Sequence, residues 1–403
     1  MQTHLAETLR NTEEGREAEA ILRSCVHCGF CNATCPTYQL LGDELDGPRG
    51  RIYQIKAVLE GAMPSERVRS HLDRCLTCRA CETTCPSGVR YGRLLDIGRP
   101  LVEQHTPPRG WRERLVRRAL RALLPHPRRF ALLLGAGQTL RPLLPPALRR
   151  RIPARRHAPL PEPGRHARRM ILLDGCVQPS LSPAINAGAV RVLDRLGIAL
   201  EPAEGAGCCG AVSHHLSATE EARSRMRRNI DAWWPAVEAG AEALVVTASG
   251  CAAMVKDYGH LLQDDPAYRD KAARIAALTR DLSEVVGAED HSVLRPRAEV
   301  PRRIAFQSPC TLQHAQSLGG RVEALLTELG FELTAVPDGH LCCGSAGTYS
   351  ILQPALAERL RAGKLEALSS GRPSLIATAN IGCLHHLAAG TEIPVHHWIE
   401  LVE

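Results

Sequence analysis

One cysteine spacing occurs twice in the first quarter of this 403-residue chain and constrains its fold more than any other feature. Both runs read C-x-x-C-x-x-C-x-x-x-C-P. Their members are Cys25, Cys28, Cys31 and Cys35 in the first run, and Cys75, Cys78, Cys81 and Cys85 in the second. Three thiolates at this interval can wrap one face of a small inorganic group, and the final proline turns the chain away. The spacing therefore predicts thiolate ligands.

This pattern is typical of bacterial ferredoxins, where each run gives three ligands to one cubane 4Fe–4S cluster and its fourth cysteine to the other. We expect one cluster on Cys25, Cys28, Cys31 and Cys85, and a second on Cys75, Cys78, Cys81 and Cys35. Structural zinc is the alternative, but zinc sites use C-x-x-C pairs rather than a three-plus-one run. The prediction is electron transfer with no catalytic residue, and with apolar cover from Val26, Phe30 and Leu76.

The sixteen cysteines indicate a reducing compartment, since the first ten residues lack the apolar core of a signal peptide. The longest apolar run, residues 130–137, is far shorter than the roughly 18 residues of a membrane span. We therefore expect a cytoplasmic protein that is at most peripheral on the inner face of the cell membrane.

Positive charge is concentrated in residues 107–169, which hold 17 Arg, no Lys and two acidic residues. This segment carries +15 of a whole-chain charge of +7, which leaves −8 for the remainder. Eleven prolines in the same segment favour a connector between two acidic globular parts.

A short basic amphipathic helix is predicted inside that connector. Trp111, Leu115, Ala119 and residues 122–124 share one helical stripe, and four arginines surround it. Such a helix suits an anionic lipid surface or an acidic partner subunit, and a solvated linker is the simpler alternative. Nucleic acid is not expected as a partner, because none of the 14 aromatic residues interleaves with the basic ones.

The other eight cysteines form a duplicated pattern. The first copy has Cys176, Cys208, Cys209 and Cys251, and the second has Cys310, Cys342, Cys343 and Cys383. The first three cysteines of each copy are offset by 134 positions and the last by 132, which indicates a repeated module. Four thiolates per copy suit an iron–sulfur cluster or a tetrahedral zinc, and buried structural thiols are the remaining alternative.

Each copy alternates strand and helix patterns, which predicts a parallel sheet with helices on its faces. The expected strands are residues 170–173, 198–200, 243–247, 304–307, 331–336 and 374–378. The expected helices are residues 184–196, 219–239, 321–329 and 354–368. The cysteines follow the strands, so both quartets should meet at carboxyl ends of a sheet.

Two motifs in this half resemble other sites. Residues 205–210 match the dinucleotide pattern G-x-G-x-x-G, but the second copy lacks the first two glycines, so no nucleotide site is assigned. Paired histidines are expected to diverge on the surface, and His385, two residues after Cys383, is the exception of interest.

Residues 25–31, the Asp-Gly-Pro-Arg-Gly-Arg stretch at 46–51, and residues 341–349 resemble the iron–sulfur subunit of glycolate oxidase (glycolate dehydrogenase). The resemblance implies an α+α/β fold with an α-helical ferredoxin-like domain, in which helices are expected at residues 49–60 and 66–72, and two CCG (cysteine-rich) modules. The expected boundaries are 1–106 for the two-cluster domain, 107–168 for the linker, 169–300 for the first module and 301–403 for the second.

The resemblance also implies partners. Flavin-binding (FAD) subunits would oxidise glycolate to glyoxylate, and electrons would leave toward a quinone-type acceptor. Equivalent subunits of lactate-utilisation or anaerobic glycerol-3-phosphate dehydrogenase complexes, and heterodisulfide-reductase-like proteins, are the alternatives. One departure stands out: the wider CCG family ends in C-x-x-C, where this chain has Met254 and His386. A cubane, a zinc or an empty site all stay open in the modules.

Overall fold

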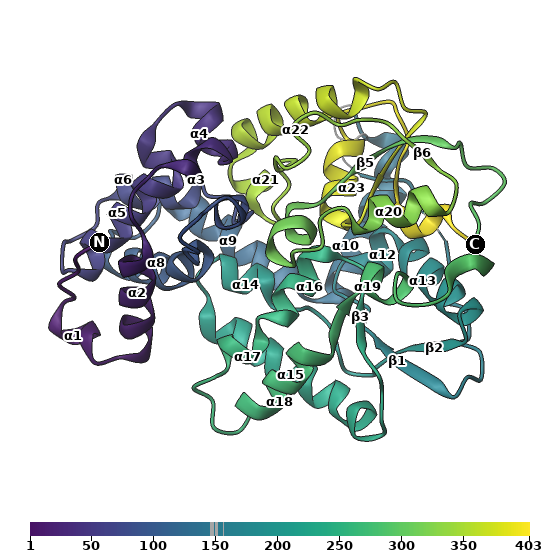
Figure 1. Ribbon diagram of the computed structural model, residues 1–403, viewed down its shortest axis with the longest axis horizontal. Coiled ribbons are helices and arrows are strands. Elements are labelled where there is room, and N and C mark those ends of the chain that lie inside the picture. The colour runs from purple at the N-terminus through teal and green to yellow at the C-terminus, as the bar shows by residue number, and fades with distance from the viewer. Residues whose placement is uncertain (146–148, 150–151, 156) are drawn as a thin grey trace.

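The computed structural model describes residues 1–145, 149, 152–155 and 157–403 (Figure 1). A helical N-terminal part lies at one end of the molecule, and two α/β modules make up the other. Within the described residues, none of the helices combines the length and apolar character that crossing a membrane requires.

The N-terminal part is built from short helices that surround the two cysteine runs. They are α1 (Glu7–Arg10), α2 (Glu13–Ser24), α3 (Phe30–Ala33), α4 (Pro36–Leu41), α5 (Pro48–Leu59), α6 (Glu66–Asp73), α7 (Ala80–Thr83) and α8 (Tyr91–His105). Side chains of Thr12 and Ser65 cap α2 and α6. Prolines start α4 and α5, where a missing amide costs nothing. The helices predicted at 49–60 and 66–72 are confirmed as α5 and α6.

The described part of the basic segment includes the α-helices α9 (Trp111–Leu123) and α10 (Pro127–Leu140). Arg109, which is 6% exposed, fixes the start of α9 through ion pairs with Asp73, Glu103 and Glu113 at 2.5–2.6 Å. The amphipathic helix predicted around Trp111 is therefore present. Residues 146–148, 150–151 and 156 of the predicted linker lie outside the described residues.

Each module holds a four-stranded, fully parallel sheet. The first has the order β2-β1-β3-β4, with β1 (Arg168–Leu172), β2 (Ile198–Pro202), β3 (Leu244–Val246) and β4 (Thr279–Asp281). The second repeats it as β6-β5-β7-β8, with β5 (Arg303–Gln307), β6 (Glu332–Leu333), β7 (Leu375–Thr378) and β8 (Val395–His397). The matching order confirms the duplication in three dimensions.

Helices cover these sheets. In the first module they are α12 (Gln178–Leu181), α13 (Pro183–Arg195), α14 (Ala211–His215), α15 (Thr219–Glu238), α16 (Ser249–Lys256), α17 (Tyr258–Leu261), α18 (Arg269–Leu278) and α19 (Leu282–Val286). In the second they are α20 (Arg321–Glu328), α21 (Tyr349–Leu352), α22 (Pro354–Ser369) and α23 (Ile381–Ala388). The four predicted helices match α13, α15, α20 and α22 to within one residue at each end.

The sequence predicted three strands per module, and the structure adds β4 and β8 at the sheet edges. Each has three residues, too few to show a periodic pattern. The strand predicted at 331–336 is reduced to Glu332–Leu333 in β6. Pro337 follows, and Asp338 has a positive φ of 49°, so the chain leaves the sheet early.

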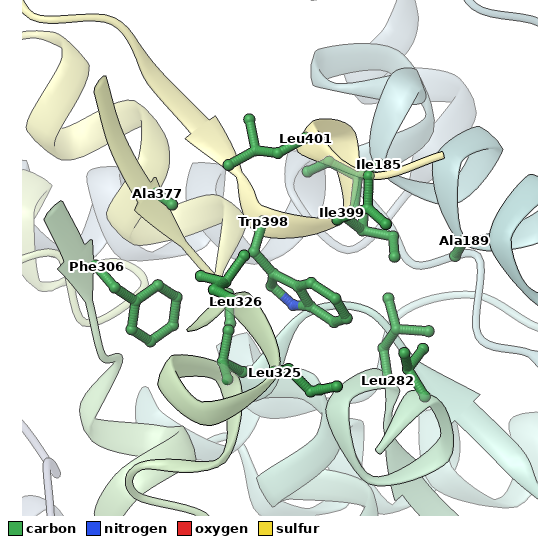
Figure 2. Close-up of a cluster of buried hydrophobic side chains, with 14 of the residues drawn as sticks. Ile185, Ala189, Leu282, Phe306, Leu325, Leu326, Ala377, Trp398, Ile399 and Leu401 are labelled. Carbon is green, nitrogen blue, oxygen red and sulfur yellow. The ribbon is translucent and has the colours of Figure 1, made fainter. Parts of the chain in front are cut away.

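The two modules share one hydrophobic core rather than packing as separate domains (Figure 2). Trp398, 1% exposed, lies at its centre between Leu282 of the first module and Leu325 of the second. The buried His397 joins them as well, since its Nε2 donates to the Thr247 carbonyl oxygen at 2.9 Å. The positions of the two cysteine quartets relative to each other are therefore fixed by this core.

Candidate metal centres

The cysteines of the first run converge with the last cysteine of the second. Cys25, Cys28, Cys31 and Cys85 all line one cavity in the N-terminal part. Gly29 has a positive φ of 86° and begins α3, which turns this loop back around the cavity. The structure thus gathers the four side chains that the ferredoxin spacing assigned to one cluster.

A second cavity lies next to the first. Cys35, Cys75, Cys78 and Cys81 line it. Cys81, Pro48 and Tyr91 line both cavities, so the two sites share a wall. The crossed arrangement, in which each run sends its fourth cysteine to the other site, is the one the sequence predicted.

The chemistry of these thiols fits a bound cationic group. Burial, together with the smaller effect of the neighbouring thiols, raises the pKa of Cys31 to about 11. Burial likewise raises the pKa of Cys78 and Cys81 well above its usual value. Thiols crowded in an apolar cavity resist ionisation unless iron or another thiophilic metal compensates their charge. With the shared Cys81 counted in the second cavity, each cavity has four such thiols, which matches the ligand count of a 4Fe–4S cluster.

Of the residues expected to cover the clusters, Leu76 is buried at 4% exposure, but Val26 and Phe30 are 68% and 60% exposed. Val26 lines the first cavity despite its exposure, whereas the Phe30 side chain lies largely in solvent, so the predicted apolar cover is partial. Both belong to the first cysteine loop, between Cys25 and Cys31. The first cavity consequently has an apolar, accessible rim.

The Asp-Gly-Pro-Arg-Gly-Arg stretch forms a buried charge network beside the second cavity. Asp46 is fully buried and contacts Arg51 at 3.5 Å, His71 Nδ1 at 3.0 Å and Arg74 at 2.8 Å. Burial opposes the charge of Arg51, but the neighbouring Cys75 and Asp46 outweigh it and keep the pKa of Arg51 above its usual value. A fixed cation therefore lies next to the second thiol quartet.

The glycines of this stretch permit close approach. A Cβ at Gly50 would lie 2.1 Å from the Glu44 carbonyl oxygen, and one at Gly47 would lie 2.7 Å from Asn32 Oδ1. Between them, Arg49 donates to Glu44 at 2.7 Å and lines the first cavity. The stretch therefore places one arginine beside each cavity.

Tyr91 is a residue that the sequence reasoning missed. Its hydroxyl donates to Cys75 Sγ at 3.7 Å, and its side chain is 4% exposed. Burial raises the pKa of Tyr91 well above 10, so the hydroxyl keeps its proton. The sequence offers no signal for this role beyond a tyrosine shortly after Cys85.

All eight cysteines of the modules line a single cavity of about 800 Å³. The two copies repeat the same contacts: Cys176 pairs with Cys208 and Cys209 with Cys251, as Cys310 pairs with Cys342 and Cys343 with Cys383. The two second-copy pairs have Sγ–Sγ distances of 3.9 and 3.2 Å.

The Cys-Cys-Gly turns explain why a glycine follows each pair. Gly210 and Gly344 have positive φ values of 92° and 88°. Their amides donate to Cys208 Sγ and Cys342 Sγ at 3.4 Å in both copies. The hydrogen bond between Cys310 and Cys342 and, to a smaller extent, burial raise the pKa of Cys310 well above its usual value. These quartets also fit a thiophilic metal group.

The two residues that stand in place of a fifth cysteine, Met254 and His386, line the same large cavity as the eight thiols. Met254 is buried in the apolar core of the first module. His386 Nε2 donates to the Ala357 carbonyl oxygen at 3.3 Å. His385 lines the cavity, and its Nε2 contacts Ser182 Oγ at 2.9 Å.

The N-terminal part is tied to the modules at this cavity. Leu76 packs with Cys342 and Tyr349, in a cluster that also includes Cys78 and Cys310. One wall of the second small cavity therefore adjoins the second-module quartet.

Charged contacts reinforce this junction. Asp257 of the first module pairs with Arg79 at 2.7 Å and Arg93 at 3.0 Å. His214 Nε2 contacts Asp96 at 3.1 Å. Burial alone would raise the pKa of Asp96, but the effect of His214 is larger, so the pKa of Asp96 lies well below its usual value.

Comparison with known proteins agrees with this geometry. Residues 21–89 match the model of a 4Fe–4S dicluster domain, and residues 170–256 and 304–388 each match that of a cysteine-rich domain. The chain is 57% identical to the glycolate oxidase iron-sulfur subunit of Escherichia coli (strain K12), over 100% of this chain and 98% of that protein.

More distant relatives were also found. The probable glycolate oxidase iron-sulfur subunit of Bacillus subtilis (strain 168) is 30% identical over 95% of this chain and 92% of its own length. Lactate utilization protein A of Geobacillus thermodenitrificans (strain NG80-2) is 29% identical over 54% of this chain and 91% of its own length.

Proposed function

The chain belongs to the family of glycolate oxidase iron–sulfur subunits, and on this premise we propose that it carries electrons within a complex that oxidises glycolate to glyoxylate. The observation that carries the proposal is the pair of adjoining four-cysteine cavities, one with an exposed rim and the other against the module cavity. Hydroxy-acid oxidation itself is assigned to a partner subunit.

The eight N-terminal cysteines would hold two 4Fe–4S clusters in the crossed arrangement. Such a cluster, when bound, accepts and releases one electron at a time. The chain's own residues set the conditions: Arg51 supplies a buried positive charge, Tyr91 donates to Cys75, and Leu76 excludes water between the second site and the modules.

A flavin-bearing (FAD) partner would dock at the exposed first cysteine loop. Val26 and Phe30 provide apolar contact there, and Arg49 lies behind them along the same cavity. Residues 205–210 match a dinucleotide pattern, but two of them are Cys208 and Cys209, which are buried and line the module cavity. We therefore assign the flavin cofactor to the partner subunit.

Electrons would leave from the modules toward a quinone-type acceptor. The cavity of about 800 Å³ is large, and its lining includes apolar side chains such as Leu181 and Phe130 beside the eight thiols. The module quartets would hold further iron–sulfur clusters, with zinc as the alternative. The sixteen free cysteines favour a reducing compartment, so the proposed location is the cytoplasm.

The first test is iron, zinc and acid-labile sulfide on anaerobically purified protein, with EPR of the reduced form. About eight irons per chain correspond to two cubanes. More iron would place clusters in the modules, zinc would make them structural sites, and little iron would overturn electron transfer. Replacing Cys28 and, separately, Cys78 with Ser should each remove one EPR signal and leave the other.

The substrate is tested on the complex with its flavoprotein. Reduction of a quinone analogue should depend on glycolate, and L-lactate or glycerol 3-phosphate as the better donor would instead favour the related complexes. The partial match to lactate utilization protein A is the observation that keeps lactate in this comparison.

A further inference from the structure

Exposed apolar side chains gather on the two helices of the basic segment. Among the described residues, seven of the fifteen exposed large apolar side chains lie between positions 111 and 143. They are Trp111, Leu115, Val116, Leu132, Leu133, Leu140 and Leu143. A concentration of this kind, in a segment of 33 residues, marks an interaction surface.

Helix α9 is turned so that its apolar stripe faces outward. Arg117, 15% exposed, pairs with Glu113 at 2.9 Å, and Arg121 pairs with Glu221 of α15 at 3.3 Å. Trp111 and Leu115, one turn apart, are 64% and 61% exposed. An ordinary surface helix would bury apolar side chains such as these, which here are exposed together with Arg112, Arg114 and Arg118.

Helix α10 presents a second apolar face. Residues 130–140 contain no charged side chain. Leu132, Leu133 and Leu140 are 76%, 53% and 53% exposed. The turn before α10 is held in place by Arg225, which donates to the Pro125 carbonyl oxygen at 3.3 Å. The exposed leucines therefore project from an anchored helix.

The charge around these side chains is positive. Arg112, Arg114 and Arg118 are exposed on α9, and the Arg112 guanidinium lies 5.3 Å from the centre of the Trp111 ring. The acidic residue of α9, Glu113, is engaged by Arg109 and Arg117. Arginines flanking exposed tryptophan and leucine side chains are characteristic of helices that lie in a membrane interface.

We propose that α9 and α10 form a docking surface for an anionic phospholipid bilayer, with Trp111, Leu115, Leu132 and Leu133 inserted at headgroup level. A bilayer fits better than an acidic protein, because α10 offers apolar side chains over its uncharged length without a partner charge to match. The inference stands on the surface itself and does not depend on the proposed electron transfer.

The surface also leads to the large module cavity. Leu124, at the end of α9, and Phe130, in the first turn of α10, both line that cavity. A bilayer held against these helices would thus lie beside an apolar way into the site that the eight thiols line.

The test is sedimentation of the full-length protein with vesicles. One set contains phosphatidylglycerol and phosphatidylethanolamine, and the other contains phosphatidylcholine alone. Binding to the anionic vesicles is expected to fall about tenfold in W111S/L115S and in L132S/L133S, since each loses two apolar side chains. The matched control is M63S/V293S, which removes side chains that are 75% and 56% exposed elsewhere, and it should bind like the wild type.

Insertion itself is read from quenching of Trp111 by brominated lipid. Of the other three tryptophans, Trp233 and Trp398 are buried at 0% and 1% exposure and Trp234, on α15, is partly buried, so most of the quenching should disappear in W111F and persist in the control. Iron content of each variant confirms that the fold survives. Failure of the wild type to bind anionic vesicles, or equal binding by all variants, would overturn the proposal. A different result would assign the surface to a protein partner instead: the wild type does not bind vesicles, and L132S/L133S no longer co-purifies with its partner subunits.

Discussion

Replacing Tyr91 with Phe should lower the reduction potential of one cluster and leave the other almost unchanged. The hydroxyl of Tyr91 donates to Cys75 Sγ at 3.7 Å, and its buried position keeps it protonated. Reduction adds a negative charge at the sulfurs, so a hydrogen bond to them is stronger in the reduced state. Removing the donor therefore disfavours reduction.

The size of the effect follows from hydrogen-bond energies. A bond to a neutral acceptor contributes about 1 kcal/mol and one to a charged acceptor about 2 kcal/mol, a difference of about 1 kcal/mol between the two redox states. Since about 59 mV corresponds to a tenfold change in a one-electron equilibrium, this amounts to a decrease of about 40 mV.

The assay is an EPR-monitored redox titration of the anaerobic protein. Tyr53→Phe is the matched control, because Tyr53 is 56% exposed and its ring lies 4.3 Å from His27 rather than on a thiol. Iron and sulfide contents must equal those of the wild type. An unchanged potential in Tyr91→Phe, or an equal shift of both clusters, would refute the reasoning.

Three further changes test the fold that supports the sites. Burial lowers the pKa of His397 from 6.5 to about 4. As the pH falls, the unfolded chain therefore binds a proton at this histidine before the folded chain does. The free energy of unfolding should be at its full value above pH 6.5 and should fall by about 3 kcal/mol between pH 6.5 and pH 4. Denaturant midpoints at pH 7.5 and 5 should show this dependence in the wild type and much less of it in His397→Gln. Arg51→Met leaves the buried Asp46 carboxylate partly uncompensated and should destabilise the protein by about 3–5 kcal/mol in the same denaturant unfolding. Arg74→Met, at the exposed side of the network, should destabilise it less. Gly344→Ala places a Cβ 2.7 Å from the Ala357 carbonyl oxygen at a residue with a positive φ. It should lower the free energy of unfolding by about 1–3 kcal/mol and reduce the iron content. Gly347 also has a positive φ but has open space around it, so Gly347→Ala should destabilise the protein less and keep its iron.

The sequence was most informative where chemistry dictates spacing. The crossed grouping of Cys85 with the first run was predicted from the analogy with bacterial ferredoxins, and the cavities gather the same residues. The long helices were equally accessible, because α13 and α15 carry clear apolar periodicity and end before Gly197 and Gly240.

Contacts between distant residues were beyond reach of the sequence. Nothing in the local pattern shows that Asp46 meets His71, or that Arg117 turns inward toward Asp73 while Trp111 turns outward. The edge strands β4 and β8 form because a preceding strand offers free backbone groups, which is a property of the sheet and not of their three residues.

The shared core around Trp398 has a consequence for the integrity of the chain. Ala298 and Glu299, in the exposed segment between the modules, could be cleaved by a protease without loss of any core side chain. The two fragments would stay associated in a native gel and separate only in denaturant. Covalent continuity between the halves is thus dispensable once folding is complete, and the paired quartets would survive the cut.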